Sequence, residues 1–164
     1  MTTFKRCCLM MCLVAVTVGC DRVTKHMAVE NLAGQPARSF LGDTVRIAYA
    51  ENTGAFLSLG ADLPQVVRTV LFTGATGILL ALLATVAWRS GWGRWRAVGL
   101  SLFIAGGLSN WIDRVIDGRV IDFLNVGIGN LRTGVFNVAD MAIMAGMAVF
   151  LLAEGNVGRK QDSH

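Results

Sequence analysis

Two aspartates lie in apolar stretches, where an ionised side chain is costly and usually has a function. Asp140 precedes an uncharged run that ends at Glu154, and Asp122 lies within the apolar run Val120–Leu124. If Glu154 marks the cytoplasmic boundary, Asp140 lies about 10 Å inside a hydrocarbon core about 30 Å thick. If the fold brings Asp122 against Asp140, the pair would share one proton and could activate water for attack on a carbonyl. The spacing alone does not bring them together.

Each acidic residue also has a structural interpretation. Asp140 follows Asn137 by three residues, so the two share a helix face and the amide can hold the carboxyl, but an acid there could equally be stabilised by the helix dipole. Asp122 could be an outward-facing acid on a half-exposed strand, or a partly desolvated one with a raised pKa. Asp113 adjoins Arg114 and is predicted to form a structural ion pair with it rather than to act in catalysis.

Two further pairs of polar residues have helical spacing. Asn110 and Arg114 are four residues apart and therefore share a face at the end of an apolar run. Asp21 and Lys25 have the same spacing after the first apolar run, and we expect an ion pair between them.

The segment 52–56 predicts a turn. Gly54 supports this interpretation because glycine tolerates backbone angles that other residues avoid. The turn interpretation is sufficient for these residues, although Asn52 could also bind a peptide backbone.

The residue inventory limits the chemistry. His26 and His164 are isolated, so the paired histidines of a zinc protease are missing, and no Gly-x-Ser-x-Gly motif occurs. A hydrolase with this sequence would use carboxylates, and we expect no metal and no cofactor.

The composition is that of a membrane protein. Of the 164 residues, 54% are hydrophobic and 16% are charged, whereas a soluble domain carries about a quarter charged residues. The net charge of +4 comes from basic residues at segment ends, which indicates membrane topology and argues against a nucleic-acid partner. We expect a single domain over 1–164 with four membrane-spanning helices at approximately 7–27, 67–88, 97–113 and 136–153.

Basic residues predict the orientation of the chain. They flank the predicted spans on one side, at Lys5, Arg6, Arg89, Arg94, Arg96, Arg159 and Lys160. The positive-inside rule makes that side cytoplasmic, so both termini are cytoplasmic and the polar segments face outward. Polar and apolar side chains alternate in residues 44–49, and residues 119–124 form a β-branched run. Both patterns predict strands, and we expect a small extracytoplasmic sheet.

The first 20 residues allow another interpretation. Lys5, Arg6 and an apolar run ending in Val18-Gly19-Cys20 could form a signal peptide with a lipid-modified cysteine. Thr17 stands where such a site usually has leucine, and three more apolar spans follow, so we favour a membrane span. The four cysteines, all between residues 7 and 20, are interpreted as small apolar residues.

Four blocks of the sequence together resemble one known family, the lipoprotein signal peptidases (signal peptidase II). These blocks are Asp21 to Lys25, Asn52-Thr53-Gly54-Ala55-Phe56, Gly106 to Arg114 continuing through Gly118 to Phe123, and Phe136-Asn137-Val138-Ala139-Asp140. They occur in the family's order, and the resemblance covers nearly the whole chain.

The resemblance implies an aspartyl endopeptidase with a catalytic dyad at Asp122 and Asp140. It implies that further residues bind substrate or support the dyad, namely Asp21, Lys25, Asn52, Gly54, Asn110, Arg114 and Asn137. The implied fold is four transmembrane helices with a small extracytoplasmic β-cradle in the bacterial inner membrane. The implied substrates are diacylglyceryl-modified prolipoproteins, cut just before the modified cysteine, and the implied inhibitor is globomycin. We expect a monomer in contact with membrane lipid.

The sequence departs from the family pattern at two places. Arg22 stands where the family usually has glutamine, and Phe56 directly follows Ala55 where a second small residue is usual. The second departure predicts an altered fit for substrate or inhibitor. The main alternative is a small four-helix transporter that uses Asp140 as a proton or cation relay. The gathering of polar residues at one face of the membrane, without paired broken helices, argues against it.

Overall fold

The structure is a computed structural model that describes residues 2–54 and 59–161. The helices are α1 (Thr3–Leu32), α2 (Gln65–Arg68), α3 (Thr76–Arg89), α4 (Arg94–Asp117) and α5 (Val138–Gln161). A π-helical segment, η2 (Thr69–Ala75), joins α2 to α3, so that Gln65–Arg89 forms one continuous rod. The strands are β1 (Arg38–Phe40), β2 (Val45–Asn52), β3 (Val120–Ile128) and β4 (Leu131–Arg132).

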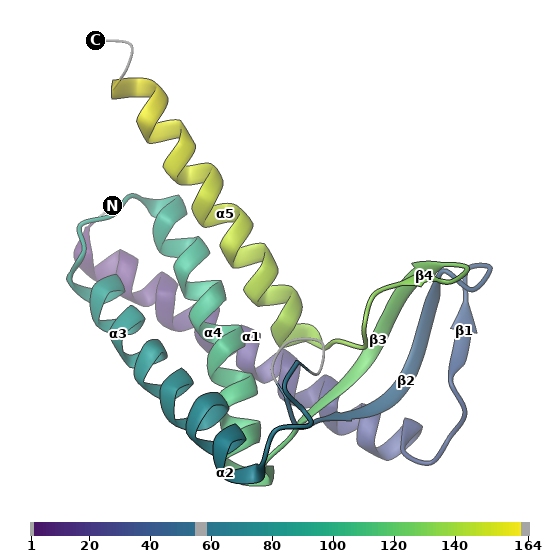
Figure 1. Cartoon of the computed structure of the whole chain (residues 1–164). Helices are drawn as coiled ribbons and strands as arrows, with labels where there is room; N and C mark the ends of the chain where they lie inside the picture. Colours follow the sequence, from purple (N-terminus) through teal and green to yellow (C-terminus); the bar gives the residue numbers. More distant parts are fainter. Residues whose placement is uncertain (1, 55–58, 162–164) are drawn as a thin grey trace.

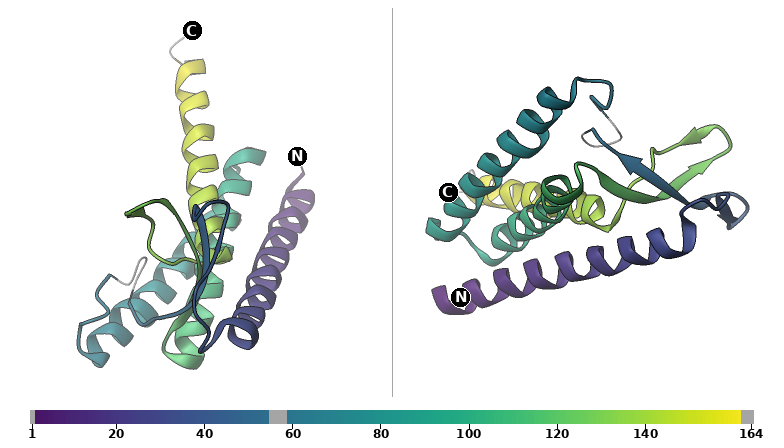
Figure 2. Two further views of the ribbon diagram at one scale, coloured as in Figure 1. Left: turned by 90° about the vertical axis from the view of Figure 1, so that its right-hand side faces the viewer. Right: turned by 90° about the horizontal axis from the view of Figure 1, so that it is seen from below.

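Helix α4 lies at the centre of the bundle and packs against α1, α3 and α5 (Figure 2). Its contact with α5 is close because both helices have glycines there. A Cβ on Gly99 would lie 2.6 Å from the Phe150 backbone nitrogen, and one on Gly106 would lie 2.2 Å from the Ala139 carbonyl oxygen. Small residues at such positions let two helix backbones approach closely, which compensates for the weak hydrophobic drive inside lipid.

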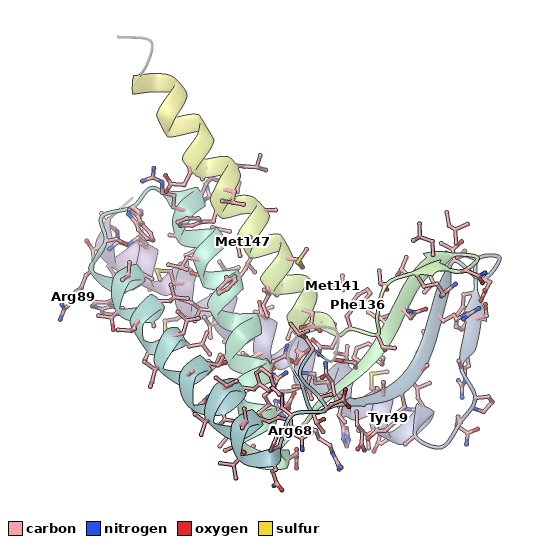
Figure 3. All side chains as sticks on the ribbon, viewed as in Figure 1. Tyr49, Arg68, Arg89, Phe136, Met141 and Met147 are labelled. Carbon is pink, nitrogen blue, oxygen red and sulfur yellow. The ribbon has the colours of Figure 1, made fainter. Side chains whose placement is uncertain are left out.

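The strands form an antiparallel sheet in the order β1-β2-β3-β4, which projects from one end of the bundle (Figure 1). The pairs Ile47↔Leu124 and Asn52↔Val120 fix the register of the two longest strands. The N- and C-terminal ends of the described chain both lie at the opposite end of the bundle (Figure 1). Figure 3 places Arg68 and Arg89 at opposite ends of the α2–α3 rod.

Three helices of the described chain are long and apolar enough to cross a membrane: Thr3–Leu32, Gln65–Arg89 and Val138–Gly155. Only 6% to 17% of their most apolar windows is buried inside the protein, so the rest of that apolar surface requires lipid. Helix α4 does not meet these criteria, because polar and charged residues gather near its end. The protein is thus a mostly helical membrane protein with a small antiparallel sheet, and the fourth crossing stays a prediction.

The strand predictions are confirmed, since residues 44–49 lie almost wholly in β2 and residues 119–124 in β3. The helices differ in length from the predicted spans: α1 continues to Leu32, and α4 continues to Asp117. Asp21 and Lys25 lie inside α1, as the predicted span 7–27 and their helical spacing implied. The limits of the membrane crossings themselves are not fixed by the helix bounds.

Candidate active site

A short turn of the chain brings together the two aspartates that lie in apolar stretches of the sequence. Asp122 lies on β3, and Asp140 lies in the first turn of α5. Between them the chain turns back at β4 and pairs again with β3, where Phe136 forms a bridge with Leu124. The backbone N–H of Phe136 donates to the Leu124 carbonyl at 2.8 Å, and the Leu124 N–H donates back at 2.8 Å. Both carboxylates consequently line one cavity of about 290 Å³ beside α4.

Asn137 and Asp140 cap the start of α5 reciprocally. The Asn137 Oδ1 accepts from the Asp140 N–H at 2.9 Å, and the Asp140 Oδ2 accepts from the Asn137 N–H at 3.2 Å. This is a capping box, in which the cap and third residues satisfy each other's free backbone donors. Asn137 does contact the Asp140 carboxyl, but through its backbone N–H and not through its side-chain amide, which donates to Asp122 instead. Asp140 also occupies the first turn of α5, where the helix dipole favours an acid.

Three asparagine amides hold the two carboxylates. Asn137 Nδ2 donates to Asp122 Oδ1 at 2.6 Å, and Asn52 Nδ2 donates to Asp122 Oδ2 at 3.0 Å. Asn110 Nδ2 donates to Asp140 Oδ1 at 2.9 Å. Asn137 also donates to Asn110 Oδ1 at 3.2 Å, so a chain of amides connects one carboxylate to the other. Every carboxylate oxygen of the pair therefore has a donor, and the positions of both acids are fixed.

A buried ion network lies next to this pair. Lys25 is only 4% exposed, and its ammonium contacts Asp21 Oδ2 and Asp113 Oδ2, both at 2.6 Å, and Asn110 Oδ1 at 2.8 Å. Asp21 Oδ1 accepts from the Ala139 N–H at 2.8 Å, so an acid of α1 caps α5. Because Asn110 touches both Lys25 and Asp140, the network supports the carboxylate pair directly.

The comparisons with known proteins decide the family. The family described as signal peptidase (SPase) II matches residues 13–154. The chain belongs to the signal peptidase II family. A lipoprotein signal peptidase of Streptococcus pneumoniae is 32% identical over 86% of this chain and 88% of its own length. Another, of Mycobacterium leprae, is 30% identical over 96% of this chain and 79% of its own length.

Solved structures agree with this fold. One bacterial membrane enzyme, determined by the in meso method at 1.9 Å, is 25% identical and has a TM-score of 0.77 over 88% of this chain and 91% of its own. A second, at 2.3 Å, is 24% identical with a TM-score of 0.75 over 90% and 88% of the two chains. This member of the signal peptidase II family is a peptidase, and nothing in these comparisons supports the transporter alternative.

Burial and charge shape the electrostatics of this signal peptidase II. The pKa of Asp122 is raised from 3.8 to about 6, mainly by burial; the neighbouring Asp140 charge also raises this pKa, whereas the hydrogen bonds from Asn52 and Asn137 lower it. The cavity and its network, within the described residues, bring together four acids (Asp21, Asp113, Asp122, Asp140) and three bases (Arg22, Lys25, Arg114). One proton on the four acids would make the net charge of this cluster zero.

The structure corrects one predicted contact. Asp113 is a structural residue as predicted, but its ion pairs are with Arg22 and Lys25, both at 2.6 Å, and not with Arg114. Arg114 instead donates to the carbonyls of Asn110 at 3.1 Å and Gly54 at 2.5 Å. Two successive helix residues point about 100° apart, so their side chains have different neighbours.

The remaining predicted site residues fall in or beside the cavity. Asn52 ends β2, and its Oδ1 accepts from the Gly54 N–H at 3.0 Å, which closes the predicted turn. The altered Ala55–Phe56 part of that turn lies outside the described residues. Sequence reasoning missed Ser109, whose Oγ donates to Asp21 Oδ2 at 2.7 Å, although helical spacing from Asp113 would have placed both on one face.

Proposed function

We propose that this peptidase is of the aspartic type and that Asp122 and Asp140 are its catalytic dyad. The main support is that both acids, 2% and 8% exposed, line one cavity and are linked by hydrogen bonds through Asn137 and Asn110. Among the described residues, the neighbouring acids Asp21 and Asp113 are ion-paired with Lys25 or Arg22, whereas Asp122 and Asp140 are held by asparagine amides. Two carboxyls this close together favour a single shared proton near neutral pH.

The proposed reaction follows from that shared proton. The ionised carboxylate removes a proton from a water molecule, whose oxygen attacks the scissile carbonyl carbon, while the protonated carboxyl donates to the carbonyl oxygen. The tetrahedral intermediate then collapses: the C–N bond breaks, and the leaving nitrogen takes the proton that the dyad gained from water. A hydroxyl of the intermediate returns its proton to the other carboxylate, so the dyad again holds one proton. Asn52, Asn110 and Asn137 hold the acids in place, and Arg114, which donates to the Gly54 carbonyl, lines the cavity that receives the peptide. Asp21 and Lys25 keep the start of α5 in position.

The proposed substrates are diacylglyceryl-modified prolipoproteins, cut just before the lipid-modified cysteine. Support comes from the names of the relatives and from the place of the cavity, where the apolar bundle meets the sheet. A lipid-anchored cysteine presents its scissile bond near the membrane surface, and the dyad is proposed to lie slightly below the outer interface. We propose that the sheet end faces the outside of the bacterial inner membrane and the termini the inside, because the positive-inside rule predicts this orientation from the basic residues. One chain carries the whole site, so we propose a monomer.

A cleavage assay tests the dyad. Purified protein is given a diacylglyceryl-modified prolipoprotein, and the released signal peptide is measured for the wild type and for Asp122→Asn and Asp140→Asn. Each variant keeps the shape of the side chain and, like the protonated acid, one accepting oxygen beside one donor, but it cannot ionise, so each is expected to lose cleavage by 10³-fold or more in order of magnitude. Asp62→Asn, which changes an exposed aspartate, is the matched control and is expected to cleave normally. Near-normal cleavage by either dyad variant would show that the pair is not the catalyst.

A further inference from the structure

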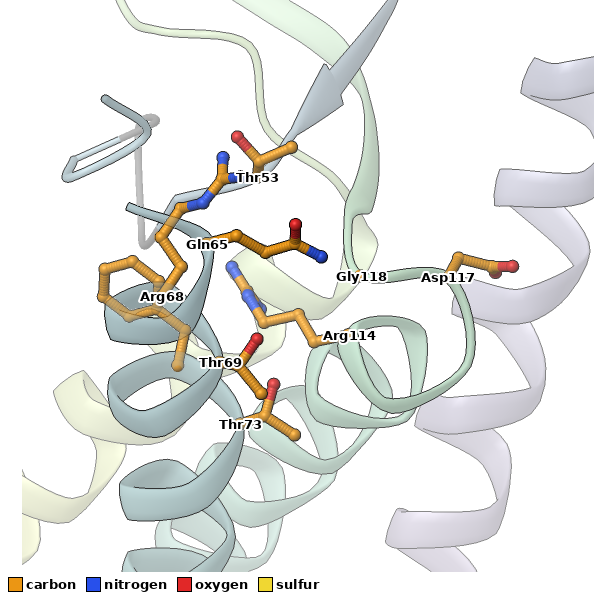
Figure 4. Close-up of a pocket in the computed structure, with 9 residues that line it drawn as sticks. Thr53, Gln65, Arg68, Thr69, Thr73, Arg114, Asp117 and Gly118 are labelled. Atoms are coloured by element: carbon orange, nitrogen blue, oxygen red, sulfur yellow. The ribbon is translucent and has the colours of Figure 1, made fainter. Parts of the chain in front are cut away.

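A second cavity adjoins the proposed active site on its water-facing side. It has a volume of about 160 Å³ and shares Phe72 and Arg114 with the cavity of the two aspartates. Thr53 follows β2, Gln65 and Arg68 come from α2, and Arg114 comes from α4. Figure 4 shows the side chains of Gln65, Arg68 and Arg114 directed into one common space. We call this space the α2 cavity.

The α2 cavity is rich in donors and positively charged. Arg68 and Arg114 contribute two guanidinium groups, whereas the one acid of the lining, Asp117, is exposed and points away from it (Figure 4). The guanidinium groups of Arg68 and Arg114 are hydrogen-bond donors with a positive charge, so this lining fits an occupant with acceptor oxygens.

The path of a peptide through the active site indicates which part of the substrate occupies the α2 cavity. A cavity of about 320 Å³ lies farther along the bundle between α3, α4 and α5, with an apolar lining that includes Leu83, Phe103 and Phe150. In a signal peptidase the residues before the scissile bond are the apolar signal segment, which remains in the membrane and suits that side. The residues after the bond must leave toward water, and the α2 cavity is the polar space next to the dyad in that direction.

We propose that the α2 cavity is the subsite for the first two residues after the modified cysteine, and that it favours an acidic side chain there. The proposal rests on the proposed function. Arg68 is the positioning cation: its Nη1 donates to the Ala61 carbonyl at 3.0 Å, which holds the guanidinium at the rim of the cavity. A carboxylate of the substrate would pair with Arg68 and lie beside the guanidinium group of Arg114.

Substrate pairs with aspartate or asparagine at each of the two positions test the proposal. Aspartate and asparagine are nearly isosteric, so their ratio of kcat/KM isolates the charge. The wild type is expected to prefer aspartate about fivefold, the upper range for a partly exposed ion pair. Arg68→Gln removes the charge and keeps an N–H donor, so its ratio is expected to fall to about one while cleavage of the asparagine substrate changes little.

Arg38→Gln is the matched control, because Arg38 is an exposed arginine at the sheet end, on β1. Its aspartate preference is expected to equal that of the wild type. A wild-type ratio of one, or an unchanged ratio in Arg68→Gln, would overturn the proposal. An equal loss on both substrates in Arg68→Gln would also overturn it, because it would reduce Arg68 to a residue that holds the backbone at Ala61. Failure of the proposed function is separate, since the wild type would then cleave neither substrate.

Discussion

Gly106 sets the distance between the central helix and the start of α5, so Gly106→Ala tests the geometry of the dyad. An added Cβ would lie 2.2 Å from the Ala139 carbonyl oxygen and 2.9 Å from Ile143 Cγ1. Ordinary contact begins at 3.4 Å, so the two backbones must separate locally by about 1.2 Å, the difference between 3.4 and 2.2 Å. Because Ala139 immediately precedes Asp140, that displacement moves the carboxylate relative to Asp122.

The expected effect is larger on activity than on stability. Misplacement of a reacting group by about 1 Å can cost roughly 10²-fold in rate, so kcat for prolipoprotein cleavage should fall by about that factor. Overpacking costs about 1–3 kcal/mol, and replacing glycine by alanine within a helix returns about 1 kcal/mol. The net loss of unfolding free energy should therefore be about 0–2 kcal/mol, and the variant remains folded.

Both quantities are measured on detergent-solubilised protein, kcat with saturating substrate and stability by thermal unfolding. Gly19→Ala is the matched control, because that glycine lies in α1 with nothing within 4 Å of an added Cβ. It should keep full activity. A folded Gly106→Ala enzyme with wild-type kcat would refute the argument, since it would show that the rate does not depend on where α5 places Asp140.

Three more predictions concern the buried polar groups. Lys25→Met leaves Asp21 without its ion pair, whereas Asp113 keeps Arg22, and should lower the free energy of unfolding by about 3–5 kcal/mol, with partial recovery when Asp21→Asn is added, as followed by denaturant titration. Asn137→Ala removes the cap of α5 at a cost of about 0.5–2 kcal/mol and should lower kcat as well, because Asp122 loses a donor. Asp122→Asn should leave stability unchanged near pH 4 and raise it above pH 7 by up to roughly 3 kcal/mol in unfolding titrations. The sign follows because the folded-state pKa, about 6, lies above the ordinary 3.8, so the stability that the protonated acid contributes is lost as pH rises through 6.

The sequence predicted the elements better than their contacts. Apolar runs indicated the helices, and alternation indicated β2 and β3, because both patterns reflect local periodicity. The meeting of Asp122 with Asp140 came only from the family resemblance. It depends on the bridge between Leu124 and Phe136, and the pairing of strands across a turn is not encoded in residue spacing.

The partners of Asp113 show the same limit. Adjacency in the chain suggested Arg114, whereas the actual partners, Arg22 and Lys25, come from another helix about 90 residues earlier. Contacts between helices depend on how the bundle packs, and Gly106 and Gly146 govern that packing at the α4–α5 interface. Both glycines were visible in the sequence, but which helix each would approach was not.

The ion pair between Asp21 and Lys25 has a consequence for how the protein is made. Both residues lie on α1, which is synthesised before α4 and α5, and the acid and amides that complete their environment lie on those two later helices. Because the pair is formed within one helix, α1 can enter the bilayer with these two charges already neutralised. The peptide amides at the start of α5 reach Asp21 only after the fifth helix has inserted. The enzyme therefore acquires its working arrangement only once α5 is in place, and a chain arrested before α5 would be inserted but inactive.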